Sequence, residues 1–405
     1  MNNNFEPIGV LDIGSYQLKF IIFKIQNSKF EILSKSISYT NGIKKGSISD
    51  LSQLSESIKN IIGKAEEDTK IKIKNIYVCP SSANSSFVNF CQSKNIGGYE
   101  VDHEKDMQFL INSGVVLFKN QNKNCNILHL FNLNSKIDKD IVCENPAGMI
   151  ADTLENEMNV IYSKTNTIRN FEKVISKSYL KSEKIIYSPY VLALLSYADN
   201  PLADMSMTID FGHEKTSVSI FRNDNFIYAS SIPVGSWHIT NDISKALNLS
   251  FEISENLKKD HSSCLIVDNN KMQEFVETEE SGFKSYKKIS NNILNKVVNA
   301  RIEEIIDLIN QDLTFLRSKN LNFNKILVTG EGSKIDGFQN ILKEKLHYKS
   351  LSIEKFHPKI KNNIPDNFDV CISVINLIIN PYNKEIPFFS KKKVSFFEKI
   401  YSFLN

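Results

Sequence analysis

The sequence lacks the features of a secreted, metal-binding or membrane-spanning protein. Its 405 residues include only six cysteines, at positions 79, 91, 125, 143, 264 and 371, and their spacing indicates neither a metal pair nor a disulfide framework. No secretory signal opens the chain, and no run of 18 apolar residues is present. The 49 Lys and Arg residues nearly balance the 46 Asp and Glu residues, so the net charge is +3 and no concentrated basic face is indicated. We therefore expect reduced thiols, a soluble intracellular body and no nucleic-acid partner.

The chain contains two segments that resemble each other. With 41% apolar and 23% charged residues it has a globular composition, and its length corresponds to about two to four domains. Each of the two segments reads as a strand, a tight polar turn and a second strand, followed by a further strand. The first comprises Ile8–Ser15, Phe20–Phe23 and Phe30–Ile37, and the second comprises Met207–Gly212, Ser217–Phe221 and Asn225–Ile232. This repetition predicts a duplicated fold with two similar α/β halves.

Apolar residues at helical spacing predict helices between and after these segments. The predicted helices span Leu51–Glu67, Thr167 to about Tyr179, Ser188–Ala198, Ile239 to about Lys259, Lys296–Arg317, Gly337–Leu346 and Val370–Ile379. Between Ser86 and about Ser163 the pattern mixes strands with a helix, which is typical of an inserted subdomain.

The two polar turns carry an Asp-x-Gly pattern that suits a nucleoside triphosphate. Gly14 and Gly212 let the backbone approach closely, so that successive N–H groups can point at phosphate oxygens. Ser15 adds a hydroxyl donor and Lys19 a positive charge. Asp12 and Asp210 can hold water molecules around a Mg²⁺ that bridges the phosphates.

A third element strengthens this interpretation. Ile326–Ser333 reads as a strand, a Gly-rich turn and the start of a helix, where a nucleoside can lie against the backbone. A single Asp-Gly turn is common in β-hairpins and does not by itself indicate a nucleotide site. Three such elements in this order favour a nucleotide site.

The order of these elements resembles the actin, Hsp70 and sugar-kinase superfamily, and within it the chain is similar to the bacterial cell-division protein FtsA over nearly its whole length. Beyond the three turns, the resemblance includes Ser81–Phe87, Asn145–Met149, Ile232–Gly235, Thr240–Ile243 and Asn299–Ile305. It implies an α/β, actin-like two-lobed fold with a duplicated core. The implied divisions are a lobe 1 core at 1–83, 164–190 and 359–382, an inserted subdomain at 84–163, a lobe 2 core at 191–242 and 323–358, a lobe 2 small subdomain at 243–322, a linker at 383–393 and an amphipathic helix at 394–405.

The resemblance also implies ATP and Mg²⁺ as ligands and names the residues that match the family motifs. These are Asp12, Gly14, Ser15, Tyr16 and Lys19 in the first phosphate motif, Asp210, Gly212, Thr216 and Gly235 in the second, and Gly330, Gly332 and Ser333 in the adenosine motif. Glu255 and Lys258 match the helix that faces the adenine and ribose, the alternative being a solvated helix face. His213 and Glu214 stand where the family often has glycines, and an inward-pointing Glu214 would repel phosphate.

Hydrolysis is expected to be slow or negligible. Relatives that hydrolyse ATP place a Glu or Gln at the helix after the first half to orient water. Here that stretch is Tyr187–Tyr190, with neither residue. ATP would then act as a structural ligand that favours self-association.

The C-terminal segment has the pattern of a membrane-surface helix. On a helical wheel the apolar residues occupy one half, and a run of three lysines precedes them. The predicted membrane-binding residues are Lys391, Lys392, Lys393, Val394, Phe396, Phe397, Ile400, Tyr401, Phe403 and Leu404. Such a helix would lie in the interface with its lysines at anionic headgroups, as in the family. A terminal helix that docks on the protein's own core is the alternative.

The resemblance thus implies an ATP-binding division protein at the cytoplasmic face of the bacterial inner membrane. It would self-associate and bind the C-terminal tail of FtsZ on its small subdomain, and its inserted subdomain would contact neighbouring subunits and later division proteins. A pilus-assembly ATPase or a small-molecule kinase on the same fold are the alternatives. The terminal helix disfavours the first, and the lack of a convincing catalytic Asp for a sugar pocket disfavours the second.

Overall fold

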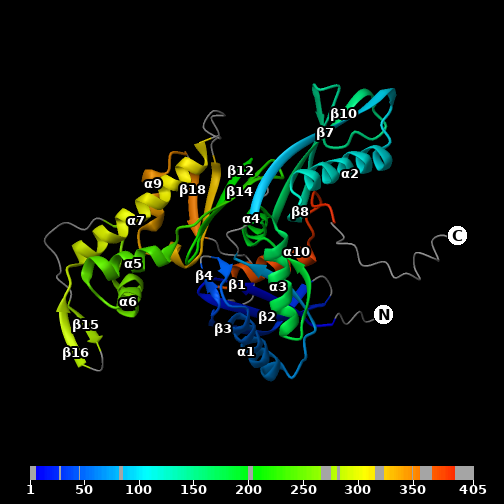
Figure 1. Cartoon of the computed structure of the whole chain (residues 1–405). Coiled ribbons are helices and arrows are strands. Elements are labelled where there is room, and N and C mark those ends of the chain that lie inside the picture. Colours follow the sequence, from blue (N-terminus) through cyan, green and yellow to red (C-terminus); the bar gives the residue numbers. More distant parts are fainter. Residues whose placement is uncertain are drawn as a thin grey trace. The chain divides into compact units, whose positions relative to one another are not determined.

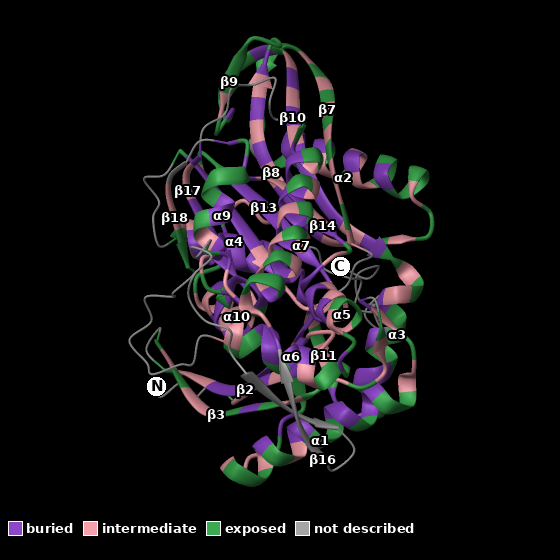
Figure 2. Ribbon diagram, turned by 90° about the vertical axis from the view of Figure 1, so that its left-hand side faces the viewer, coloured by how far each residue is buried: buried purple, intermediate pink, exposed green. Residues whose placement is uncertain are grey.

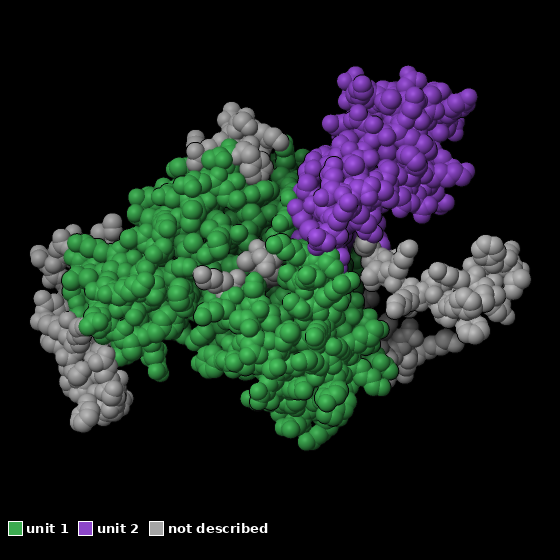
Figure 3. Space-filling view, in the orientation of Figure 1, with its two compact units in different colours: residues 1–87, 163–382 green, residues 88–162, 383–405 purple. Residues whose placement is uncertain are grey.

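The computed structural model describes residues 6–26, 29–44, 46–81, 85–198, 204–265, 275–280, 283–314, 323–348, 350–355 and 367–387. The chain forms two compact units, unit 1 with residues 1–87 and 163–382 and unit 2 with residues 88–162 and 383–405 (Figure 3). The predicted membrane helix at 394–405 and the lysines at 391–393 lie outside the described residues. Within the described ranges, no helix combines the length and the apolar character needed to span a bilayer.

Unit 1 contains two five-stranded sheets with the same connectivity. The first has the order β11-β6-β1-β2-β3 and the second the order β14-β13-β12-β17-β18. In each, three consecutive strands form an antiparallel meander, and two later strands add in parallel beside the first. This agreement confirms the predicted duplicated α/β fold. The strands are β1 (Ile8–Ile13), β2 (Gln17–Gln26), β3 (Lys29–Tyr39), β6 (Asn75–Pro80), β11 (Lys181–Ile185), β12 (Met205–Phe211), β13 (Thr216–Arg222), β14 (Asn225–Ile232), β17 (Phe323–Thr329) and β18 (Ser350–Lys355).

Helices cover the first sheet. α1 (Leu51–Thr69) begins at Asp50, whose carboxylate accepts from the N–H groups of Ser52 and Gln53. Its apolar face packs on β2 and β3, and α3 (Thr165–Lys177) packs on α1 and β11. α10 (Asp369–Ile379) lies against β1 and β2 (Figure 1). The central strands are therefore almost wholly buried, as Figure 2 shows.

The second half of unit 1 adds a helical group to its sheet. α4 (Ser188–Ala198) packs on β12–β14 and on α10. α5 (Ser236–Leu247), α6 (Phe251–His261) and α7 (Asn291–Asp312) lie together, with the hairpin β15 (Phe275–Glu280) and β16 (Phe283–Lys288) beyond them (Figure 1). α9 (Phe338–Lys345) contacts α7 and β18. The short hairpin β4 (Ile43–Lys44) and β5 (Ser47–Ile48) precedes α1.

The predicted helix at 239–259 is two helices. Asn248 adopts the left-handed conformation, with φ 50°, and ends α5. The Ser250 hydroxyl then accepts from the Ile253 N–H and starts α6. Both residues favour helix ends, and this local signal outweighs the continuous apolar spacing.

Unit 2 is a four-stranded sheet with the order β7-β10-β8-β9 and one helix. Its elements are β7 (Ser85–Glu100), α2 (His103–Gln121), β8 (Cys125–Ile137), β9 (Ile141–Cys143) and β10 (Ile150–Lys164). Leu110 of α2 and Leu154 of β10 belong to one apolar cluster, and Phe118, Leu130 and Met158 to another.

The chain returns to unit 2 after α10. The Asn132 N–H donates to the Lys384 carbonyl and the Ile386 N–H to the Leu130 carbonyl, each at 2.8 Å. Glu385 Oε1 lies 2.7 Å from His129 Nδ1, and the His129 side chain is fully buried. The segment predicted as a linker thus starts with residues held along β8.

Candidate nucleotide-binding site

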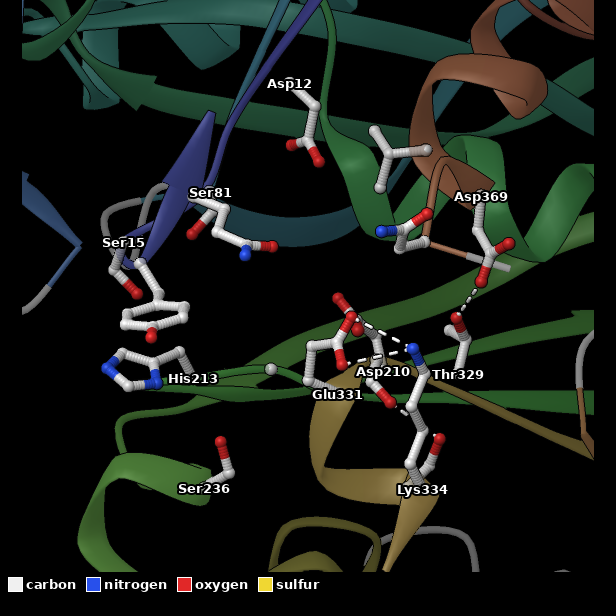
Figure 4. A pocket seen from close by; sticks show the side chains of 18 of the residues that line it. Asp12, Ser15, Ser81, Asp210, His213, Ser236, Thr329, Glu331, Lys334 and Asp369 are labelled. Carbon is white, nitrogen blue, oxygen red and sulfur yellow. Dashed lines mark hydrogen bonds and ion pairs between the residues drawn. The ribbon is translucent and has the colours of Figure 1, made fainter. Parts of the chain in front are cut away.

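Unit 1 contains a cavity of about 740 Å³ that residues of both sheets line. Figure 4 shows Ser15, Ser81 and His213 on one side and Thr329, Lys334 and Asp369 on the other. Of the residues predicted for the site, the cavity brings together Asp12, Gly14, Ser15, Tyr16, Lys19, Asp210, Gly212, Glu255, Lys258, Gly330 and Ser333. Thr216, Gly235 and Gly332 do not line it.

The first phosphate turn is closed by its own backbone. The Gly14 N–H donates to the Gln17 carbonyl at 3.0 Å, and a Cβ on Gly14 would lie 2.7 Å from that oxygen. Asp12 and Lys19 are directly opposite on β1 and β2. Burial raises the pKa of Asp12 to about 6, Lys19 lowers it, and the nearby Asp210 raises it.

The second turn repeats this geometry. The Gly212 N–H donates to the Lys215 carbonyl at 2.9 Å, and burial also raises the pKa of Asp210. Gly235 packs so closely that a Cβ would lie 2.6 Å from the Gly212 carbonyl oxygen. The buried Thr216 hydroxyl donates to the Val234 carbonyl. Thr216 and Gly235 therefore support the conformation of the turn without lining the cavity.

His213 and Glu214 contact the first half of unit 1. The His213 ring stacks on the Tyr16 ring with centroids 4.6 Å apart, and Lys259 Nζ lies 5.5 Å from the Tyr16 centroid. Glu214 Oε2 accepts from the Gly46 N–H at 3.1 Å. Glu214 is not among the residues that line the large cavity.

The Gly-rich turn follows β17, which pairs with β12, and it lies beside the second turn. Gly330 has φ +86°, and a Cβ there would lie 2.4 Å from the Phe211 carbonyl oxygen. Gly332 packs against the Phe211 ring, which explains why it does not line the cavity. The short 3₁₀ helix η1 (Glu331–Lys334) follows, and the Ser333 hydroxyl donates to the Gly330 carbonyl.

Glu255 and Lys258 are buried and paired. Lys258 Nζ lies 2.7 Å from Glu255 Oε2, and the Thr240 hydroxyl donates to the same oxygen. Burial raises the pKa of Glu255, but Lys258, Thr240 and Lys259 outweigh it, and the net pKa lies below the ordinary value. Burial lowers the pKa of Lys258. The solvated-face alternative is thus wrong, because only 10% and 6% of these side chains are exposed.

The cavity also contains residues that sequence reasoning missed. These are Gln17, Ser81, Ser188, Leu192, His213, Ser236, Lys259, Val328, Thr329, Glu331, Lys334, Ile335, Lys355, Asn367, Asp369 and Val370. The Thr329 hydroxyl donates to Asp369 Oδ2 at 2.6 Å, across 40 positions of sequence. The buried Asn367 Oδ1 has no hydrogen-bond partner within the described part of the chain, which leaves an acceptor for a ligand.

The residues fit a nucleotide with its magnesium held through water. Two carboxyl groups with raised pKa values, Asp12 and Asp210, line the cavity, and a cation beside them would stabilise their charged forms. No group of three or more His, Cys, Asp or Glu side chains among the described residues is placed to bind a metal directly. An outer-sphere Mg²⁺ is consistent with both observations.

Solved structures with the same fold are actin-like. The PilM protein of the "PilM-PilN type IV pilus biogenesis complex" matches with a TM-score of 0.65 at 12% identity, covering 92% of this chain and 99% of that one. MreB5 of Spiroplasma citri bound to AMPPNP matches with a TM-score of 0.54 at 14% identity, covering 92% and 96%. The protein is therefore of the actin-like ATPase fold class.

The sequence relatives of the chain are FtsA proteins. The family profile described as "Cell division protein FtsA" matches residues 207–366. FtsA of Agrobacterium fabrum is 24% identical, covering 82% of this chain and 77% of the relative. FtsA of Buchnera aphidicola is also 24% identical, covering 98% and 96%. The chain is therefore similar to FtsA cell-division proteins over most of its length, in agreement with the resemblance recognised in the sequence.

Proposed function

We propose that the protein is an ATP-binding, self-associating division protein that tethers FtsZ to the inner membrane and recruits later division proteins. The observation that carries the proposal is the cavity of about 740 Å³, in which both Asp-x-Gly turns and the Gly-rich turn meet. The pilus ATPase and kinase alternatives are not favoured, because the sequence relatives are FtsA proteins.

In the proposed complex, ATP lies with its phosphates at the two turns and its nucleoside at Gly330–Ser333. Backbone N–H groups, the Ser15 hydroxyl and Lys19 would bind the phosphates. Asp12 and Asp210 would hold the water shell of Mg²⁺, which neutralises phosphate charge. Slow hydrolysis stays a prediction, supported by the absence of Glu and Gln from Tyr187–Tyr190.

Membrane attachment is proposed for residues 391–404. Full-length protein should co-sediment with vesicles of anionic phospholipid, because the aromatic face inserts while the lysines bind headgroups. A chain ending at Ser390 should remain in the supernatant. Neutral vesicles serve as the control and should retain less of the full chain. Equal sedimentation of both chains would place lipid binding elsewhere and remove the terminal helix from the proposal.

An open groove between α5 and α7 is the proposed dock for the FtsZ tail. It has a volume of about 490 Å³ and is lined by Asp242, Lys245, Ala246, Val297, Ala300, Arg301 and Glu304. Arg301 is held by two bonds to the Asp242 carboxylate, with Nε 2.6 Å from Oδ2 and Nη2 3.0 Å from Oδ1. The groove thus offers a small apolar floor between fixed charges, which suits a short peptide with mixed side chains.

Val297→Asp should weaken binding of a fluorescent FtsZ-tail peptide at least tenfold, because it places a charge on the apolar floor. Lys296→Asp is the matched control. Lys296 is the exposed neighbour on α7 and does not line the groove, so its substitution should change the affinity little. Fluorescence anisotropy measures both. Equal affinities for the two variants would place the tail on another surface.

A further inference from the structure

A buried lysine stands directly behind the second phosphate turn. Lys215 is only 9% exposed, and no hydrogen bond or ion pair joins its ammonium group to any described residue. It lines a second, small cavity of about 30 Å³. A cavity of this size has room for a small polar group such as a water molecule or phosphate oxygens.

The small cavity adjoins the nucleotide cavity. The two share six lining residues, namely Ser15, Ser81, Ser188, Asp210, Gly212 and His213. Hydroxyl groups form much of the remaining wall. Ser231 joins Tyr187 and Ser217 there, with oxygen separations of 3.3 and 2.9 Å. The cavity therefore presents one cation, Lys215, and several hydroxyl groups, together with the carboxylates of Asp210 and Glu214.

We propose that Lys215 and the surrounding hydroxyl groups form a subsite for a terminal phosphate group. This inference rests on the proposed ATP function and adds a ligand-binding residue to it. Lys19 serves the first turn in the same way, so each Asp-x-Gly turn has its own lysine. The Lys215 charge also offsets the adjacent Glu214, which stands where glycine is usual in the family.

The unfavourable free energy of burying the Lys215 ammonium group supports a role for Lys215 in ligand binding. An unpaired ammonium group inside a protein destabilises the fold unless an anion meets it. Burial lowers the pKa of Lys215 to about 7, although Asp210 and Glu214 each raise it. A bound phosphate would restore the charged form and turn an unfavourable burial into a charge-assisted contact.

The test compares binding of AMPPNP, ADP, and ADP with inorganic phosphate to the full chain and to Lys215→Met. The variant should bind AMPPNP about 10–100-fold more weakly, since hydrogen bonds to charged groups have this magnitude, and ADP equally well. If ADP binding in the wild type also improves when phosphate is added, the subsite accepts free phosphate. If it does not, the subsite needs the covalently attached group. Either result fits the proposal provided that Lys215→Met loses the terminal-phosphate preference.

Lys334→Met is the matched control, because Lys334 lines the nucleoside end of the same cavity. It should weaken AMPPNP and ADP by the same factor. Without nucleotide, Lys215→Met should unfold at a temperature equal to or above that of the wild type, because it removes a buried unpaired charge. An equal loss of both nucleotides in Lys215→Met, or lower stability without ligand, overturns the subsite. Failure of the wild type to bind any nucleotide overturns the proposed function instead.

Discussion

Glu385→Ala should destabilise unit 2 by roughly 2–5 kcal/mol, because it removes one partner of a buried contact. Glu385 Oε1 lies 2.7 Å from His129 Nδ1, and the two side chains are 9% and 0% exposed. The same segment contributes two backbone hydrogen bonds to β8, and Ile386 packs on the apolar cluster that contains Leu130. Loss of the carboxylate should therefore release these contacts together.

The measurement has to report on unit 2 itself. The single tryptophan, Trp237, lies in unit 1 and is a poor probe. Hydrogen exchange of the Ile386 and Asn132 amides is suitable, since both donate across the pairing with β8. Both amides should exchange at least tenfold faster in Glu385→Ala.

Glu157→Ala is the control for this variant. Glu157 also lies in unit 2, where it accepts from Asn89 in an exposed hydrogen bond, and Asn89 keeps a second acceptor in Asn159. Its substitution should change the stability by less than about 1 kcal/mol. Unchanged exchange at Ile386 in Glu385→Ala would mean that backbone pairing alone holds the segment.

The sequence predicts the repeated core because its signals are local. The apolar strands around Asp12 and Asp210 carry their own turns, and β14 begins and ends at the predicted residues. The first residues of helices are harder to predict from the sequence. α7 begins at Asn291, five residues before the predicted Lys296, because its first two residues are asparagines, which favour helices weakly, and Ser290 makes no side-chain capping bond.

Local sequence signals also predict part of the candidate site. Glycines and aspartates of the three turns have sequence signatures, whereas Asn367 and Asp369 reach the cavity from a distant segment with none. The His129–Glu385 contact spans 256 positions. The burial of Lys215 could not be predicted from the sequence either. A lysine in a polar turn is expected to be exposed to solvent, and only tertiary packing buries it.

Asp210→Asn should reduce the affinity for Mg-ATP by about 10–100-fold and remove most of its dependence on magnesium. Asp210 lines the cavity with Asp12, and the proposed role of the pair is to hold the hydration shell of the cation. Asparagine keeps the shape and loses the charge. Hydrogen bonds to a charged group contribute about 1.5–3 kcal/mol, which corresponds to this range of affinity.

Calorimetry with ATP in excess Mg²⁺ and in EDTA separates this role from a structural one. Wild type should bind ATP more tightly with Mg²⁺, and Asp210→Asn should bind it about equally in both. Asp204→Asn, at an exposed position just before β12, should behave as wild type. Because burial raises the pKa of Asp210, the variant should unfold no earlier than the wild type without ligand. A fully retained magnesium effect in Asp210→Asn would assign the cation to other groups and leave Asp210 as a residue of the turn.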